Sequence, residues 1–176
     1  ENLPNRQFHA EGGGQKWVSG ITYPRTSGGW VHLTAAPDLF DRKVIGWALS
    51  AGMETVHTAI PALEMACASR TPGNGLIFHS DRGAQYCAKS FRDRLGELRP
   101  SVRQSMSRKG HSWDNACAAT FFKTLKRELE TLDGKHAAAE ARQLVFMYVE
   151  AYYNRLRIHS ALDYMAPDVF NSRQVA

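Results

Sequence analysis

The chain has 176 residues, of which 43% are hydrophobic and 22% charged, and this composition is typical of a single globular domain with its own core. Its formal net charge of +5 favours a polyanionic partner, although charge alone identifies none. Cys67, Cys87 and Cys117 lack the spacing of a zinc site and predict a reducing compartment such as the cytoplasm. No apolar run approaches the ~18 residues of a membrane span, so we expect no membrane partner.

The first part of the chain predicts an arm followed by three strands. Residues 1–14 are polar and glycine-rich, which indicates a linker or arm, with the core domain over 15–176. The runs 16–23, 30–36 and 43–50 are rich in β-formers and have short connections. Such runs predict an antiparallel meander.

The rest of the chain alternates helices with short strands. Helices are predicted over 53–70, where Pro61 is a local disturbance, and over 89–98, 114–130 and 136–157, with Asp114 as an N-cap. Strands are predicted over 75–80 and 102–106. The order predicts an α/β fold: a five-stranded mixed sheet, antiparallel in its first three strands, flanked by helices.

The segment HSDRGAQY (79–86) carries the first candidate for chemistry. Asp81 directly follows a short apolar strand, and open α/β sheets place ligands at the carboxyl ends of their strands. Its carboxylate could therefore face a metal ion. An aspartate that caps a turn fits the same pattern, and this segment alone does not decide between the two.

Basic residues follow in the segment 105–130. Arg108 and Lys109 lie in a glycine-containing loop and can neutralise phosphates. On the predicted helix, Lys123 and Lys126 share a face with residue 119 by the i+3/i+4 rule. This face is either a solvated basic surface or a grip on a DNA backbone.

Several blocks in the same order, from Trp17 to about Phe170, resemble the integrase core of the two-reading-frame bacterial insertion-sequence transposases. They are HSDRGAQY, QSMSRKG, SWDNA, FFKTLKRE and YNRLRIHSAL. The chain is more distantly similar to the retroviral integrases. The resemblance implies an RNase H-like fold and an Asp–Asp–Glu triad that holds two Mg²⁺ or Mn²⁺ ions for DNA strand transfer.

Only one of the three triad positions holds a carboxylate in this chain. The family's second Asp matches Asp81, but its first Asp falls on Gly20 and its Glu falls on Ala119. The spacing from Asp81 to Ala119 is longer than the family's, and the extra residues fall in GELRPSV (96–102). We therefore expect weak or absent metal binding and impaired catalysis. Enzymatic activity is an open question at this point.

Other carboxylates could in principle replace the missing two. The nearest by sequence are Glu11, Asp38, Asp41 and Asp114, and none matches the geometry of the triad. The substitutions are consistent with drift in a decaying element or with deliberate inactivation, and the sequence does not decide between them.

The resemblance also implies double-stranded DNA, both element ends and target, as the partner, with self-association possible and a nucleoid setting in a bacterial cytoplasm. The residues expected to contact DNA are Arg82, Gln85, Arg108, Lys109, Lys123, Lys126, Arg155 and Arg157. His159 is either a further contact or a structural residue. Three hypotheses stay open: a transposase core with a broken triad, a silent DNA-binding or assembly module, and a remnant without a role. Another RNase H-like nuclease is the alternative lineage.

Overall fold

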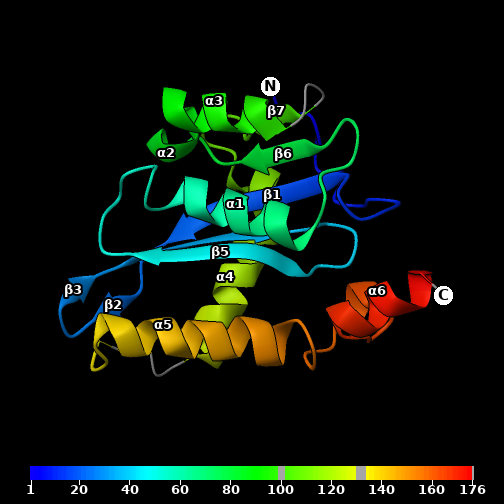
Figure 1. Ribbon diagram of the computed structural model, residues 1–176. Helices are drawn as coiled ribbons and strands as arrows, with labels where there is room; N and C mark the ends of the chain where they lie inside the picture. The colour runs from blue at the N-terminus through cyan, green and yellow to red at the C-terminus, as the bar shows by residue number, and fades with distance from the viewer. Residues whose placement is uncertain (99–101, 130–133, 176) are drawn as a thin grey trace.

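A five-stranded mixed sheet forms the centre of the computed structural model, which describes residues 1–98, 102–129 and 134–175 (Figure 1). The strand order is β5-β4-β1-β6-β7, with β1 and β4 antiparallel, β4 and β5 antiparallel, and β1, β6 and β7 parallel. The strands are β1 (Lys16–Thr22), β4 (His32–Pro37), β5 (Val44–Ser50), β6 (Ile77–Ser80) and β7 (Arg103–Met106). The predicted sheet, with its antiparallel first three strands, is confirmed.

A short hairpin interrupts the predicted meander. Strands β2 (Arg25–Thr26) and β3 (Gly29–Trp30) pair with each other and form a separate two-stranded sheet. Gly29 has a φ of 117°, a conformation that glycine adopts without strain. The connection between the first two predicted strands therefore contains this small hairpin.

One face of the main sheet is covered by α1 (Ala59–Ser69) and α3 (Lys89–Leu98), with the single-turn helix α2 (Ala84–Cys87) before α3 (Figure 1). The helix expected over 53–70 begins only at Ala59, which places Pro61 in the first turn, where its missing N–H costs nothing. Helix α1 lies so close to β5 that a Cβ on Gly46 would come within 2.1 Å of the Ala62 carbonyl oxygen. Only glycine fits at this position.

The opposite face is covered by α4 (Ala116–Glu128), α5 (Ala138–Phe146) and a π-helical segment, η2 (Met147–Tyr153). Leu33 and Ala35 of β4 point toward these helices, whereas the alternate residue Ala36 packs on the α1 side. The helix predicted over 136–157 is thus α-helical only to Phe146. After η2 come η3 (Ser160–Leu162) and α6 (Pro167–Val175), the latter near the C-terminus in Figure 1.

The N-cap assigned to Asp114 was wrong. A 3-10 turn, η1 (Ser112–Asn115), precedes α4, and Asn115 occupies the N-cap position without a side-chain cap bond. Asp114 is instead fully buried, where Arg108 and Arg6 donate to its carboxylate. A buried carboxylate needs charged partners, and these two arginines supply more than a backbone N–H would.

Residues 1–14, all of them described, form no helix or strand but contact the core. Ser105 Oγ accepts a hydrogen bond from the Leu3 N–H, and the Glu1 carbonyl accepts one from the Met106 N–H. The Gly14 N–H donates to Asp38 Oδ2 at 2.7 Å. The division at residue 14 stays a prediction. Among the described helices, none has the length and apolar character needed to cross a membrane.

Candidate active site

The parallel pairing of β1 with β6 brings two of the predicted triad positions together. Ser19 pairs with Ser80, so that the next residues, Gly20 and Asp81, are neighbours at the carboxyl edge of the two strands. This is the edge at which open α/β sheets present ligand-binding groups.

Helix α4 brings the third position to the same edge. The Asn115 side-chain amide donates to the Ser19 carbonyl at 2.8 Å and so attaches the start of α4 to β1. Asn115, Ala118, Ala119 and Phe122 follow helical i, i+3, i+4, i+7 spacing and form one wall of a pocket of about 400 Å³. Gly20, Asp81 and Ala119 all line this pocket, which we call the triad pocket.

Asp81 is the one carboxylate among the lining residues of the triad pocket. Its side chain is exposed, and Oδ1 accepts a hydrogen bond from the Gly83 N–H at 2.8 Å. The turn-capping role weighed for this residue is therefore present in the structure. The second carboxylate oxygen, Oδ2, points to no hydrogen-bond donor among the described residues.

The cationic side chains of Arg82, Arg108 and Lys109 also line the triad pocket. Arg82 is exposed and its Nε donates to the Ser107 carbonyl at 2.8 Å. Arg108 and Lys109 are exposed on the loop that follows β7. Arg108 donates from Nε to Asp114 at 2.9 Å, and its hydrogen bonds hold the pKa of Asp114 well below the usual range despite burial. Arg108 thus enters the pocket with its charge already paired.

The lining residues do not fit a pair of divalent metal ions. Gly20 and Ala119 offer no oxygen, and Asp81 alone is far short of the six oxygen ligands that Mg²⁺ requires. Within 1–98, 102–129 and 134–175, no group of three or more His, Cys, Asp or Glu side chains lies close enough together to hold a metal ion. The triad pocket therefore lacks the oxygen ligands of a two-metal site.

None of the four carboxylates weighed as substitutes lines the triad pocket. Asp38 and Asp41 are fully buried and bind Arg70, Asp114 binds Arg108, and Glu11 borders a different hollow. Burial would lower the pKa of Arg70, but its hydrogen bond to Asp41 and the charges of both aspartates raise the pKa above its usual value. Asp38, Asp41 and Asp114 thus form ion pairs within the fold, and Glu11 lies away from the triad pocket.

The other predicted DNA-contacting residues lie outside the triad pocket and differ in availability. Lys123, Lys126 and Arg155 are exposed. Arg157 is paired with Glu128, with 3.1 Å between Nε and Oε2. Gln85 is 8% exposed and its amide donates to the Met53 carbonyl at 3.1 Å, so this side chain is engaged in the fold.

Sequence reasoning missed two residues that shape the pocket. Asn115 lies in the SWDNA block and connects α4 to β1, but the block indicated only a triad position. Phe122 lies opposite Gly20, and a Cβ on Gly20 would come within 3.1 Å of its ring. A side chain that fills space left by a neighbour has no signature in a single sequence.

Family models place this site in a known context. Residues 10–112 match a model described as integrase core domain, and residues 100–167 match a second model with the same description. The chain belongs to the integrase core family.

Two curated relatives are bacterial transposases. The transposase InsF for insertion sequence IS3A of Escherichia coli (strain K12) is 42% identical over 178 residues, which cover 100% of this chain and 60% of that protein. The transposase for insertion sequence element IS904 of Lactococcus lactis subsp. lactis (strain IL1403) is 40% identical over 169 residues, covering 96% of this chain and 66% of that protein. The integrase core thus spans less than two thirds of the length of these relatives.

Solved structures show the fold of this integrase core. The simian T-cell lymphotropic virus intasome contains a chain with a TM-score of 0.71 and 14% identity, over 90% of this chain and 54% of that one. The HTLV-2 integrase catalytic core domain in complex with magnesium, in a trimeric form, gives a TM-score of 0.63 and 13% identity, over 90% and 96% of the two chains. The predicted RNase H-like fold is confirmed.

Proposed function

We propose that this chain is the core domain of a bacterial insertion-sequence transposase that binds double-stranded DNA but has lost strand-transfer chemistry. The observation that carries the proposal is the composition of the triad pocket, in which Asp81 is accompanied by Gly20, Ala119 and three cationic side chains. The 42% identity to a transposase supports the lineage. The proposed setting is the bacterial cytoplasm, at the nucleoid.

The expected loss of activity follows from what the missing carboxylates would do. In two-metal phosphoryl transfer, paired ions stabilise the attacking and the leaving oxygen together. A pocket with Asp81 as its one acid cannot retain such a pair. A loss of about 4 kcal/mol of transition-state stabilisation corresponds to roughly a thousandfold in rate, so we expect Mg²⁺ or Mn²⁺ to bind weakly or not at all.

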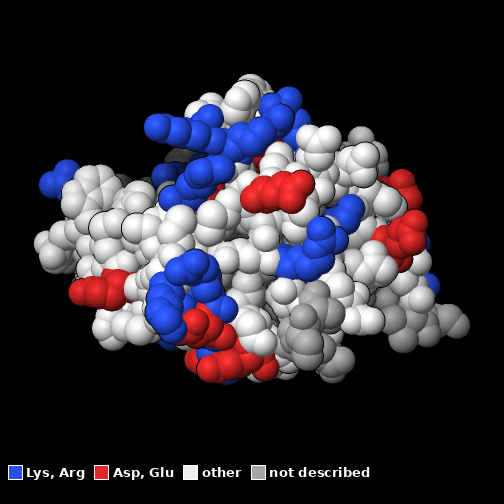
Figure 2. Space-filling view, turned by 90° about the horizontal axis from the view of Figure 1, so that it is seen from above, with Lys and Arg blue, Asp and Glu red and all other residues white. Residues whose placement is uncertain are grey.

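DNA binding rests on cations that the fold leaves exposed. Arg82 and Lys109 line the triad pocket, and Lys123, Lys126 and Arg155 are exposed elsewhere. Figure 2 shows the face seen from above, where one group of Lys and Arg side chains lies along the upper border and others lie elsewhere on the face, some beside acidic side chains. Such a surface attracts the phosphate backbone without reading its sequence. Arg108, Arg157 and Gln85 are weaker candidates, because each already has an intramolecular partner.

The test compares this chain with the double variant Gly20→Asp/Ala119→Glu. Both proteins are incubated with Mn²⁺ and an oligonucleotide that ends in the exposed 3′-OH of an insertion-sequence end, and strand-transfer products are resolved on a gel. We expect products from the variant, at a rate at least roughly a thousandfold above the unchanged chain. The triple variant with Asp81→Asn is the matched control and should be inactive.

Binding is measured separately by fluorescence anisotropy with a labelled duplex. The unchanged chain should bind in EDTA, with an affinity that falls steeply as salt rises. Strand transfer by the unchanged chain that Asp81→Asn abolishes would overturn the claim of lost chemistry. Absence of any salt-dependent DNA binding would overturn the claim of a binding module.

A further inference from the structure

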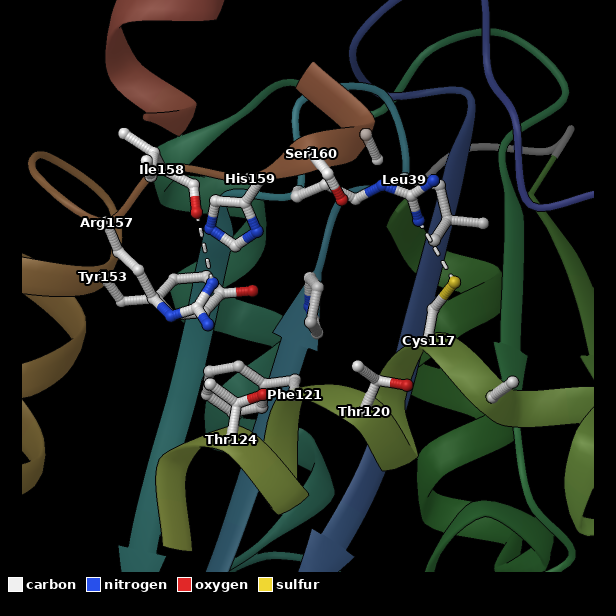
Figure 3. A pocket seen from close by; sticks show the side chains of 14 residues that line it. Leu39, Cys117, Thr120, Phe121, Thr124, Tyr153, Arg157, Ile158, His159 and Ser160 are labelled. Carbon is white, nitrogen blue, oxygen red and sulfur yellow. Dashed lines mark hydrogen bonds between the residues drawn. The ribbon is translucent and has the colours of Figure 1, made fainter. Parts of the chain in front are cut away.

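A second pocket, of about 460 Å³, lies on the other flank of α4 and shares no lining residue with the triad pocket. One wall is the helix face formed by Cys117, Thr120, Phe121 and Thr124 (Figure 3). Tyr153 and residues 157–161 form the opposite wall, and Leu39 and Arg42 of the β4–β5 turn lie between them. We call it the α4-flank pocket.

The charged groups that line the α4-flank pocket are all cationic at neutral pH. They are the guanidinium groups of Arg42 and Arg157, and no Asp or Glu is among the lining residues. Arg157 lies over the Tyr153 ring, with 5.7 Å from its Cζ to the ring centroid, and is fixed from outside by Glu128. Because Glu128 pairs with Arg157, the guanidinium group of Arg42 is the cation that favours an anion in this pocket.

The backbone conformation of Arg42 and the contacts of its side chain both fix its position beside the α4-flank pocket. Its φ of 61° is in the left-handed region, which residues other than glycine, asparagine and aspartate seldom adopt. Its Nη2 donates to the Phe8 carbonyl at 3.0 Å and its Nη1 approaches Cys117 Sγ at 3.1 Å. Sulfur is a weak acceptor, so Nη1 has no strong partner and is available to an anion.

The remaining lining combines apolar surface with unused polar groups. Leu39, Phe121, Tyr153 and Ile158 supply the apolar part, and the labelled side chains of Thr120 and Thr124 lie on the wall formed by α4 in Figure 3. His159 packs edge-on to Tyr153, with 4.9 Å between ring centroids, and its Nε2 is buried without a hydrogen-bond partner. Burial, and then the charges of Arg157 and Arg42, lower the pKa of His159 to about 4, which leaves it neutral at pH 7.

We propose that the α4-flank pocket binds a planar aromatic anion of nucleotide size, with its phosphate or carboxylate at Arg42 and its ring against Tyr153 and Phe121. The volume lies within the ~300–1,000 Å³ of small-molecule sites. The Nη1 of Arg42 can donate to an oxyanion, and the apolar walls desolvate the ring.

The experiment measures binding of thymidine 5′-monophosphate and of uncharged thymidine to the whole chain by calorimetry or by NMR shift mapping. We expect the monophosphate to bind at least tenfold more tightly than thymidine. Arg42→Asn should weaken its binding tenfold or more, and this variant should fold because asparagine tolerates the left-handed backbone. Arg92→Gln, at an exposed arginine of α3, removes the same charge elsewhere and should leave binding unchanged.

A pocket-filling variant separates this site from the triad pocket. Thr120→Trp, at an exposed position of α4, should abolish binding of the monophosphate and leave salt-dependent duplex binding intact. Competition by a 5′-phosphorylated thymidine oligomer would show that the ligand is a nucleotide at a DNA end, and its failure to compete that it is a free nucleotide. Equal affinity for thymidine and its monophosphate, no binding of either, or binding that survives both Arg42→Asn and Thr120→Trp would overturn the proposal.

Discussion

Asp38 and Asp81 both directly follow strands of the same sheet, yet their surroundings differ in almost every respect. Asp38 is fully buried, and its carboxylate accepts hydrogen bonds from the Gly14 and Phe40 N–H groups, Trp17 Nε1 and Arg70 Nη1. Asp81 is exposed and accepts one hydrogen bond, from the Gly83 N–H.

The difference explains how a chain of this family can keep its fold while the residues for chemistry change. A buried carboxylate with several donors cannot be removed without leaving those donors unsatisfied, so the fold itself requires it. A carboxylate that faces an open pocket, with few donors of the protein around it, contributes little to the free energy of folding. The proposed triad positions Gly20 and Ala119 line the pocket, where the fold does not require an acid, whereas Asp38 is fixed by its contacts.

The sharpest test of this comparison is the same substitution at both positions. Asp38→Asn should lower the free energy of unfolding by about 3–5 kcal/mol, because it leaves Arg70 without one of its two buried charge partners and faces an amide toward other donors. Asp81→Asn should change it by less than about 0.5 kcal/mol, as for other exposed sites. Urea denaturation followed by circular dichroism measures both values, and similar losses at the two sites would contradict the comparison.

Sequence reasoning recovered what depends on local pattern and failed where long-range contacts decide. Helix 89–98 could be predicted because its amphipathic residues repeat with the period of a helix, and the strand predicted over 102–106 is present at 103–106. Asp114 looked like an N-cap by position, but Arg6, far away in the chain, draws it into a buried ion pair. Gln85 looked like a DNA contact because of its neighbours, and the packing of α2 buries it.

The two pockets differ in the same way, because one could be predicted from local patterns and the other depends on long-range packing. The register of Ser19 with Ser80 and the helical spacing of α4 brought Gly20, Asp81 and Ala119 to one pocket, as the order of the blocks predicts. The α4-flank pocket had no sequence signal. Arg42, Cys117 and Arg157 are separated by long stretches of chain, and they meet because η2 and the β4–β5 turn pack against α4.

A smaller effect is expected from His159, a buried group whose pKa the fold lowers. Its folded pKa of about 4 is below the ordinary 6.5, so the unfolded chain binds more protons between these values. The resulting stability is complete above about pH 6.5 and is lost as the pH falls toward 4. Allowing for partial solvent access, the loss is on the order of 1–2 kcal/mol.

Thermal unfolding at several pH values checks this slope. The matched variant is His159→Gln, which retains a polar side chain of similar size but does not titrate. We expect the variant to lose less stability than the parent chain between pH 6.5 and 4.5. Identical slopes for the two proteins would mean that His159 does not titrate with the depressed pKa.

The smallest effect concerns the cost of restoring an acid at residue 20. A Cβ there would be 3.1 Å from the Phe122 ring and 3.7 Å from the Ala118 Cβ, so the ring must tilt by a few tenths of an ångström. We expect Gly20→Ala to lower the free energy of unfolding by less than about 1 kcal/mol, and Gly20→Asp by about 1 kcal/mol, since the carboxylate adds repulsion from Asp81.

A double-mutant cycle between Gly20→Ala and Phe122→Leu isolates the contact with the ring, and its coupling energy should be about 0.5–1 kcal/mol in favour of the pair. Ala119→Glu, at an exposed position of α4, should change stability by less than about 0.5 kcal/mol. The two proposed triad positions then differ in the stability cost of an acidic substitution. Ala119→Glu costs little, whereas Gly20→Asp must displace the Phe122 ring that packs over the strand. A coupling energy of zero would place the Phe122 ring elsewhere in solution, and the strand edge at Gly20 would then be as open to a carboxylate as the helix face at Ala119.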